Sequence, residues 1–421
     1  MNSPDTFCKN ALASGLAAWC HNAARFVMSC YDNDTGGYRS VPGGMPTLYG
    51  TCYSLLTLHY LGAGQRLSGR SWEFISHCQD RDTGYFVGPE LLGWTPPAGA
   101  KHDREHLLMH LTCTVLPVLA EFGLQAPYPL HFAHPFVDQA ALHAWLEARN
   151  LRDAWFEGNN LLFVGQLLAY LRDVERVPGA QEALNYWFAW LDERVDPATG
   201  LWGTDLGAST FEAMCGAYHQ LLVYYHENRP VRYRRQLVDS VLSLQHKDGG
   251  FAPSGGGGAC EDVDAVDILV NMYKQLDYRR AAIRVALRRC MRLILSIANA
   301  DGGFPYRRGV TCTHMGIPAT TTTPGGSGAF STWFRVHTLA LIAEILTDED
   351  ELRGQSFRFN RQLSMGWHLA WDRSVHPVGC SDRLRELAGL CRLVLQRTAT
   401  SVGSKARRMK RRLMRVAQMW W

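Results

Sequence analysis

The sequence predicts an all-α protein, an (α/α)6 toroid built from six helix pairs and followed by a C-terminal helical extension. Three observations predict this fold: a short turn motif recurs along the chain, segments with helical spacing of apolar residues flank the turns, and strand patterns are nearly absent. A fixed period of about 50 residues indicates a repeat architecture rather than separate domains. We expect the toroid over residues 11–348, the extension over 349–403 and a basic amphipathic tail over 404–421.

The turn motif is an aspartate followed by glycine and an aromatic residue. It begins at Asp34, Asp82, Asp196, Asp248 and Asp301. The step from Asp82 to Asp196 is about twice the others, which indicates one further unit without the aspartate signature. Residues 151–158, Leu-Arg-Asp-Ala-Trp-Phe-Glu-Gly, lie near the midpoint and keep the order of polar turn, aromatic residue and glycine. Six units follow.

Two kinds of helix are expected in each unit. Segments before the turns, such as 237–244 and 282–295, have apolar residues at the spacing of an amphipathic helix. Segments after the turns, such as 51–58, 161–168 and 336–343, are apolar nearly all round. This contrast predicts an outer and an inner layer, with the amino-terminal ends of the inner helices lining the mouth of a central cavity.

Composition sets limits on the class of protein. The chain has 421 residues, of which 47% are hydrophobic, so a large core can be buried. Its twelve cysteines show no CxxC pair, and its start lacks a secretory pattern, so we expect reduced thiols and a cytoplasmic protein. No apolar run approaches 18 residues, so a transmembrane helix is not expected.

The tail carries an uneven share of the net charge of +4. Seven basic residues between Lys405 and Arg415 alternate with apolar ones, and the chain ends in Trp420 and Trp421. Such a segment suits peripheral contact with an anionic membrane surface. The alternative is a solvated tail, or one that binds an acidic partner or nucleic acid, of which nucleic acid is the less expected.

The strongest candidate site follows the glycine-rich run 249–258. Glu261, Asp262, Asp264 and Asp267 place four carboxylates within seven residues, at the start of an apolar helix. Helix capping accounts for Glu261 or Asp262 but not for the other two, which share a helix face at i and i+3. Because buried carboxylates need a cation, a proton or a ligand, Asp264, Asp262 and Asp267 are the candidate catalytic residues.

A helical toroid with Asp-Gly-Gly-Phe turns resembles the terpenoid cyclase and protein prenyltransferase superfamily. Its members include squalene-hopene cyclases and the β subunits of farnesyl- and geranylgeranyltransferases. Residues 36–58 look like the glycine-rich turn and inner helix of a prenyltransferase repeat, and 334–339 are similar to the helix that carries the zinc histidine. The resemblance covers about 11–348.

The resemblance implies two possible sites, and each departs from the family pattern. A prenyltransferase-like zinc site implies Asp262, Asp264 and His337 as ligands of a divalent metal, Zn or Mg, but the family's ligating cysteine is absent. A class II cyclase motif, Asp-x-Asp-Asp, implies Asp264 as the general acid, but Ala265 replaces the last aspartate. Asp267, one turn on, is the candidate substitute. No cofactor is identified by the sequence itself.

Further polar and aromatic residues near the expected mouth are candidates for substrate binding. They are Glu157, Asn159, Asn160, His106, Trp202 and Trp333. Capping by the amides, and packing or hydrogen bonding by the histidine, are the simpler explanations for these residues. The loop through Cys312 and His314 is long enough for a lid, but we expect an ordinary loop.

Three functions remain open at this point. The first is an isoprenoid-processing enzyme, either class II terpene cyclase-like or prenyltransferase-like, whose partner is an isoprenoid or another apolar small molecule. The second is a carbohydrate-active toroid enzyme, a hydrolase or lyase, with Asp264 and either Glu157 or Asp267 as an acid/base pair. The third is a non-catalytic toroid in a biosynthetic complex.

Overall fold

A computed structural model describes residues 15–63, 68–349, 352 and 357–358, and these residues form an all-α fold. Within them, extended structure is limited to two short antiparallel strands, β1 (Tyr38–Arg39) and β2 (Pro46–Thr47), and isolated bridges. None of the described helices combines the length and apolar character needed to cross a bilayer. The prediction of an all-α toroid is confirmed.

Within the described residues, six outer helices alternate along the chain with six inner ones. The outer helices are α2 (Gly15–Ser29), α4 (Gly69–Ser76), α6 (Gln139–Glu147), α8 (Ala180–Arg194), α10 (Arg234–Ser243) and α12 (Arg280–Ser296). The inner helices are α3 (Leu48–Tyr60), α5 (Arg104–Glu121), α7 (Ala154–Tyr170), α9 (Thr210–His226), α11 (Ala259–Gln275) and α13 (Ala329–Ala343). The unit inferred around residues 151–158 is therefore the pair α6 and α7.

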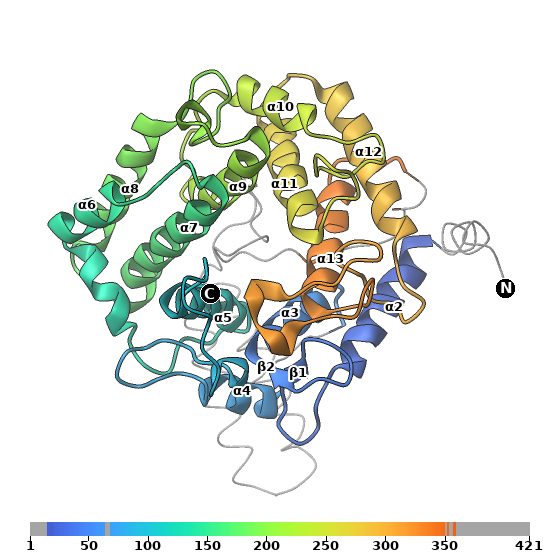
Figure 1. Ribbon diagram of the computed structural model, residues 1–421, viewed down its shortest axis with the longest axis horizontal. Helices are drawn as coiled ribbons and strands as arrows, with labels where there is room; N and C mark the ends of the chain where they lie inside the picture. The colour runs from blue at the N-terminus through green and yellow to red at the C-terminus, as the bar shows by residue number, and fades with distance from the viewer. Residues whose placement is uncertain (1–14, 64–67, 350–351, 353–356, 359–421) are drawn as a thin grey trace, which may run out of the picture. The chain divides into compact units, whose positions relative to one another are not determined.

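The inner helices form a closed ring. Each contacts the next in chain order, and α13 packs against α3, which completes the circle (Figure 1). Burial follows the predicted layers: every residue of α3 except His59 is buried, whereas α12 buries only the stripe that includes Ile283, Leu287 and Ile294. Apolar residues all round a helix thus mark the inner layer, and one apolar stripe marks the outer layer.

The first two turns begin two residues earlier than the sequence pattern suggested. The carboxylate of Asp32 accepts the backbone N–H of Thr35 at 2.9 Å, and that of Asp80 accepts the N–H of Thr83 at 2.7 Å. Asp34 and Asp82 are therefore not the turn-forming aspartates. The N–H groups of Gly36 and Gly84, two residues after Asp34 and Asp82, are already bonded to the backbone carbonyl oxygens of Asp32 and Asp80.

Each of four turns is tied to its inner helix by one hydrogen bond from the aromatic residue that follows the glycine. The backbone N–H groups of Tyr38, Phe86 and Phe304 donate to the hydroxyls of Thr51, Thr112 and Thr332, respectively, at 2.9–3.0 Å. In the fifth unit the N–H of Phe251 donates to the carboxylate of Asp262 at 2.9 Å. Asp262 therefore occupies the position that a threonine holds in three other units.

The expected tail over 404–421 and nearly all of the expected extension over 349–403 lie outside the described residues.

Candidate active site

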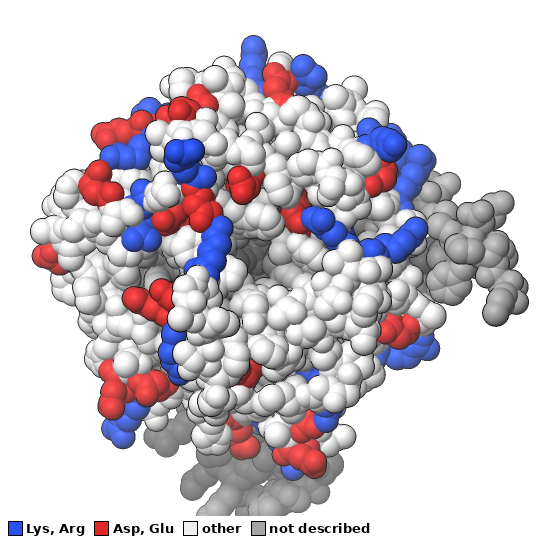
Figure 2. Space-filling model, in the orientation of Figure 1, with Lys and Arg blue, Asp and Glu red and all other residues white. Residues whose placement is uncertain are grey.

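A cavity of about 420 Å³ lies at the amino-terminal ends of the inner helices. Figure 2 shows it as a hollow at the centre of one face, with charged side chains placed around it. It is lined by residues of the inner helices and of the loops before α5 and α13: Tyr53, Lys101, His102, His110, Trp155, Phe156, Asn159, Glu212, Tyr218, His219, Cys260, Asp264, Tyr306, Thr311, Cys312, Thr313, His314, Met315, Phe330 and Phe334. Aromatic rings therefore make up much of the wall, and Lys101 is the one lysine or arginine among these described lining residues.

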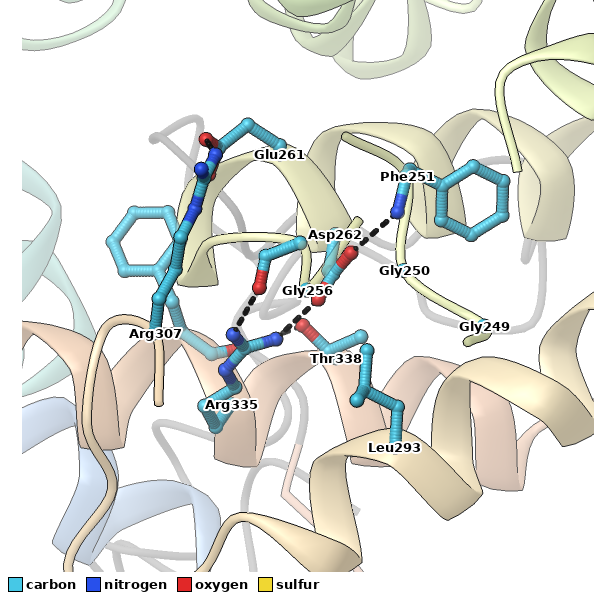
Figure 3. A network of polar contacts seen from close by, with 12 residues as sticks. Gly249, Gly250, Phe251, Gly256, Glu261, Asp262, Leu293, Arg307, Arg335 and Thr338 are labelled. Carbon is cyan, nitrogen blue, oxygen red and sulfur yellow. Dashed lines mark hydrogen bonds and ion pairs between the residues drawn. The ribbon is translucent and has the colours of Figure 1, made fainter. Parts of the chain in front are cut away.

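Two of the four clustered carboxylates are held by arginines. The carboxylate of Asp262 pairs with the guanidinium of Arg335, and neither side chain is exposed. The carboxylate of Glu261 pairs with Arg307 and accepts a hydrogen bond from the hydroxyl of Tyr306 at 2.7 Å. Figure 3 shows Asp262 between Phe251 and Arg335, and Glu261 beside Arg307. Burial raises the pKa of Asp262 and Arg335 opposes that rise; since a buried guanidinium keeps its proton, Asp262 is its counter-charge.

The glycine run before α11 is needed for this packing. A Cβ atom on Gly257 would lie far inside van der Waals contact with Oδ1 of Asp262, and one on Gly258 would collide with the carboxylate of Glu261. Arg335 also donates to the backbone carbonyl oxygens of Gly257 and Tyr306, at 2.7 and 2.8 Å. The glycines therefore bring the backbone close to the two carboxylates and to Arg335.

Asp264 is the buried carboxyl group of the cavity lining, and it forms no ion pair with another described residue. It is 1% exposed, and its Oδ2 atom has no hydrogen-bond partner. Burial raises its pKa well above the ordinary value, and the neighbouring Glu261 adds to the rise, while the thiol of Cys215 opposes it. A carboxyl group whose pKa is raised in this way keeps its proton to a higher pH than an ordinary aspartate does, which is the property required of an acid.

Asp267 lies one turn deeper on α11 and does not line the cavity. Its Oδ1 atom accepts a hydrogen bond from the side-chain amide of Asn271 at 3.0 Å, and its Oδ2 atom has no partner. Burial raises its pKa to about 7. The charge of Asp267, when present, raises the pKa of Asp264, so its effect on the site is electrostatic.

Three histidines face the cavity deep in the ring. Nδ1 of His110 lies 2.8 Å from the hydroxyl of Tyr49, and Nε2 of His314 lies 3.1 Å from the hydroxyl of Tyr53. Nδ1 of His219 lies 2.7 Å from the backbone carbonyl oxygen of Cys215. Burial lowers the pKa of each, to about 4 for His219 and about 3 for His314, so these imidazoles are neutral near pH 7.

The expected metal site is not assembled. Asp262, Asp264 and His337 were the expected ligands, but Asp262 is paired with Arg335, and both ring nitrogens of the fully buried His337 lack hydrogen-bond partners. The ring of His337 instead stacks on Trp333 at 5.5 Å. Across the part of the chain that the structure describes, no group of three or more His, Cys, Asp or Glu residues is placed to hold a metal ion. These residues do not fit a zinc or magnesium ion, because a guanidinium occupies the place of the cation.

The expected substrate-binding residues separate into two groups. Asn159 lines the cavity. Glu157 instead pairs with Arg149 at 3.2 Å and accepts the side-chain amide of Asn160 at 3.0 Å, and Asn160 in turn contacts Nδ1 of His106 at 2.9 Å. Trp202 is 3% exposed and donates its indole N–H to the carbonyl oxygen of Leu191 at 2.9 Å. Trp333 is fully buried.

These positions correct part of the expectation. Glu157, Asn160, His106, Trp202 and Trp333 are absent from the lining of the cavity, and their side chains instead make hydrogen bonds, an ion pair or ring contacts with other residues. Neither Glu157 nor Asp267 lines the cavity beside Asp264 as the second member of an acid/base pair.

Sequence reasoning missed several lining residues. His314 was assigned to an ordinary loop, but its ring stacks on Phe330 at 4.0 Å and forms part of the cavity wall. Tyr218 and His219 lie within an apolar helix and carry no motif. One signal was available in the repeat. In three units, the residue two positions after the acceptor of the turn N–H is Tyr53, Asp264 or Phe334, so the repeat places these three side chains at one level of the ring.

One of three comparisons with known proteins, the one with family models, agrees with this architecture. The family model of the prenyltransferase alpha-alpha toroid domain matches residues 16–68 and 161–317, which include all of α11. A comparison with curated protein sequences gave no match. Among solved structures, a polysaccharide lyase is similar with 15% identity and a TM-score of 0.36, over 58% of this chain and 75% of that chain.

Proposed function

Because the chain belongs to the α/α toroid superfamily of the protein prenyltransferases and terpenoid cyclases, we propose that it is an isoprenoid-processing enzyme that starts a cyclisation with an acid. The observation that carries the proposal is the environment of Asp264: a buried carboxyl group with a raised pKa on the wall of an aromatic-lined cavity, with one oxygen atom that has no hydrogen-bond partner.

Protonation of a carbon–carbon double bond requires a carboxylic acid that holds its proton until the substrate arrives. Burial and the neighbouring Glu261 supply that condition for Asp264. The proton leaves the carboxyl group for one alkene carbon, and the positive charge forms on the other carbon. The carboxylate that remains is shielded from water, since Asp264 is 1% exposed.

The cavity wall is suited to the cation that follows. The rings of Tyr53, Trp155, Phe156, Tyr218, Tyr306, Phe330 and Phe334 line the cavity. The faces of aromatic rings attract cations by about 0.5–2 kcal/mol each, and they do not react with a carbocation as a nucleophilic side chain would. An apolar wall also keeps water from capturing the charge early.

A transferase that moves a prenyl group from its diphosphate is less well supported by the same cavity. Such chemistry needs cations to neutralise the leaving diphosphate. Among the described lining residues Lys101 is the one candidate, and its Nζ atom lies 2.7 Å from Asp153. The acid mechanism needs no such cluster.

The test is turnover by the purified full-length protein in D2O with geranylgeranyl diphosphate and, separately, squalene as probes. We expect a cyclised product that carries deuterium at the carbon protonated first. Asp264→Asn keeps the size and polarity of the side chain but cannot supply the proton, so the rate should fall by about 10²–10⁴-fold, the usual contribution of a positioned acid. Asp277→Asn, an exposed change after α11, is the matched control.

Other results would contradict the proposal. Turnover of oligosaccharides, with no product from either isoprenoid, would indicate a carbohydrate-active enzyme. Binding of an isoprenoid without any product would indicate a non-catalytic toroid. Full activity of Asp264→Asn would place the acid elsewhere.

A further inference from the structure

One cavity histidine has a fixed tautomer. His110 and His314 each meet a tyrosine hydroxyl, which can donate or accept a hydrogen bond, so their protons are not assigned by geometry. His219 meets the backbone carbonyl oxygen of Cys215 at 2.7 Å, and a carbonyl oxygen only accepts. The proton of the neutral imidazole therefore lies on Nδ1, and the lone pair lies on Nε2.

The lone pair of His219 is directed away from its own helix. Nδ1 faces the backbone of α9 one turn back, so Nε2 lies on the opposite edge of the ring. His219 lines the same cavity as Asp264 and is 6% exposed. Its ring lies 5.1 Å from that of Tyr218, which also lines the cavity. A neutral proton acceptor and a neutral proton donor thus share one compartment.

We propose that His219 is the general base that ends the reaction started by Asp264. This inference rests on the proposed function. After ring closure, Nε2 of His219 accepts a proton from a carbon next to the cationic centre. The electrons of that C–H bond form a new C=C bond, and the product is a cyclic alkene.

The proton and charge balance closes without a co-reactant. Asp264 gives one proton to the substrate and becomes a carboxylate, while His219 takes one proton and becomes an imidazolium. The substrate is isomerised, with no net gain or loss of atoms. Return of the proton from the imidazolium to the carboxylate, through solvent after product release, restores both groups.

The environments of the two groups agree with these roles. Burial lowers the pKa of His219 to about 4 and raises that of Asp264 well above its ordinary value. Groups whose pKa values are moved apart in this way keep acid and base in the required forms over a wide pH range. Glu212, the other carboxylate of the lining, is exposed in the first turn of α9, at the mouth.

The test compares the products of wild type and His219→Phe, with geranylgeranyl diphosphate and squalene as probes. Phenylalanine keeps an aromatic ring of similar size but has no lone pair. We expect the substrate still to be consumed, because Asp264 is intact, while the ratio of alkene to alcohol products falls by about 100-fold, the low end of the effect of a positioned base. His219→Gln is the second variant, and His226→Gln, at the other end of α9, is the control.

The outcomes distinguish failure of the proposed base from failure of the proposed function. An unchanged product ratio in both folded His219 variants, or a wild-type product that is mainly an alcohol, would overturn the base and leave the acid in place. No turnover by the wild type would overturn the proposed function, and the base with it.

Discussion

Asp262 and Arg335 form an ion pair in which neither side chain is exposed to solvent. Asp262 also accepts a hydrogen bond from the backbone N–H of Phe251. The equivalent N–H in each of three other units donates to a threonine hydroxyl. Asp262, the first aspartate of the Asp-x-Asp motif, therefore connects the turn of the fifth unit to the inner helix α11 by a hydrogen bond. Asp264, two residues later, is left as the member that faces the cavity.

Removal of Arg335 should destabilise the fold. Arg335→Leu leaves the carboxylate of Asp262 buried without its counter-charge, which costs about 3–5 kcal/mol of unfolding free energy. The double variant Asp262→Thr, Arg335→Leu should recover part of that loss, because threonine accepts the same turn N–H in other units. Denaturant titration followed by circular dichroism measures the unfolding free energy of the single and the double variant. If Arg335→Leu is as stable as wild type, the buried ion pair is contradicted.

Gly257→Ala should be destabilising. The new Cβ atom would collide with Oδ1 of Asp262, so either the loop or the ion pair must move, at a cost of about 1–3 kcal/mol. Gly69→Ala is the control, because a Cβ atom there meets nothing within 4 Å in the first turn of α4. Thermal unfolding of the two variants side by side should show a lower midpoint for Gly257→Ala only.

Asp267 should make stability fall as the pH rises. Its pKa is about 7 in the folded protein and 3.8 ordinarily, so between these values the folded state keeps a proton that the unfolded chain has lost. Its contribution to the unfolding free energy is complete below pH 3.8 and declines by at most about 1.4 kcal/mol per pH unit up to about pH 7.

Asp267→Asn should remove this slope, so the variant gains stability relative to wild type as the pH is raised through the window. Unfolding free energies at several pH values provide the measurement, with the exposed change Asp277→Asn as control. Parallel curves for Asp267→Asn and wild type would show that Asp267 does not hold its proton.

We propose that the basic tail contacts anionic membranes. Deletion of residues 404–421 should abolish sedimentation with phosphatidylserine vesicles at low salt and leave the helical signal intact, because each basic residue contributes about 1 kcal/mol at such a surface. Failure of the full-length protein to sediment would exclude this role.

Much of the fold was predictable because it repeats. Apolar residues all round one helix and along one stripe of the next identified the two layers, and the long step between Asp82 and Asp196 located the pair α6 and α7. The turn positions were less certain from sequence, since Asp32 and Asp34 both precede the glycine and only hydrogen-bond geometry separates them.

The site was only partly predictable. Asp264 was found because it is crowded by other carboxylates. Arg335 was not, because it lies inside an otherwise apolar helix and its partner is 73 residues away in sequence. That arginine is also the reason that the expected metal ligands are not brought together.

The proposed reaction requires that Asp264 holds its proton near neutral pH. Infrared difference spectroscopy tests the protonation state of Asp264 directly. The two proteins compared are Asp267→Asn and the double variant Asp264→Asn, Asp267→Asn, because the shared change removes the second titrating carboxyl group. We expect the difference spectrum at about neutral pH to contain the carbonyl stretch of a protonated carboxylic acid, and this band should persist as the pH is raised well above the ordinary range of aspartate. A carboxylate band in its place at neutral pH would show that Asp264 is ionised and cannot be the acid.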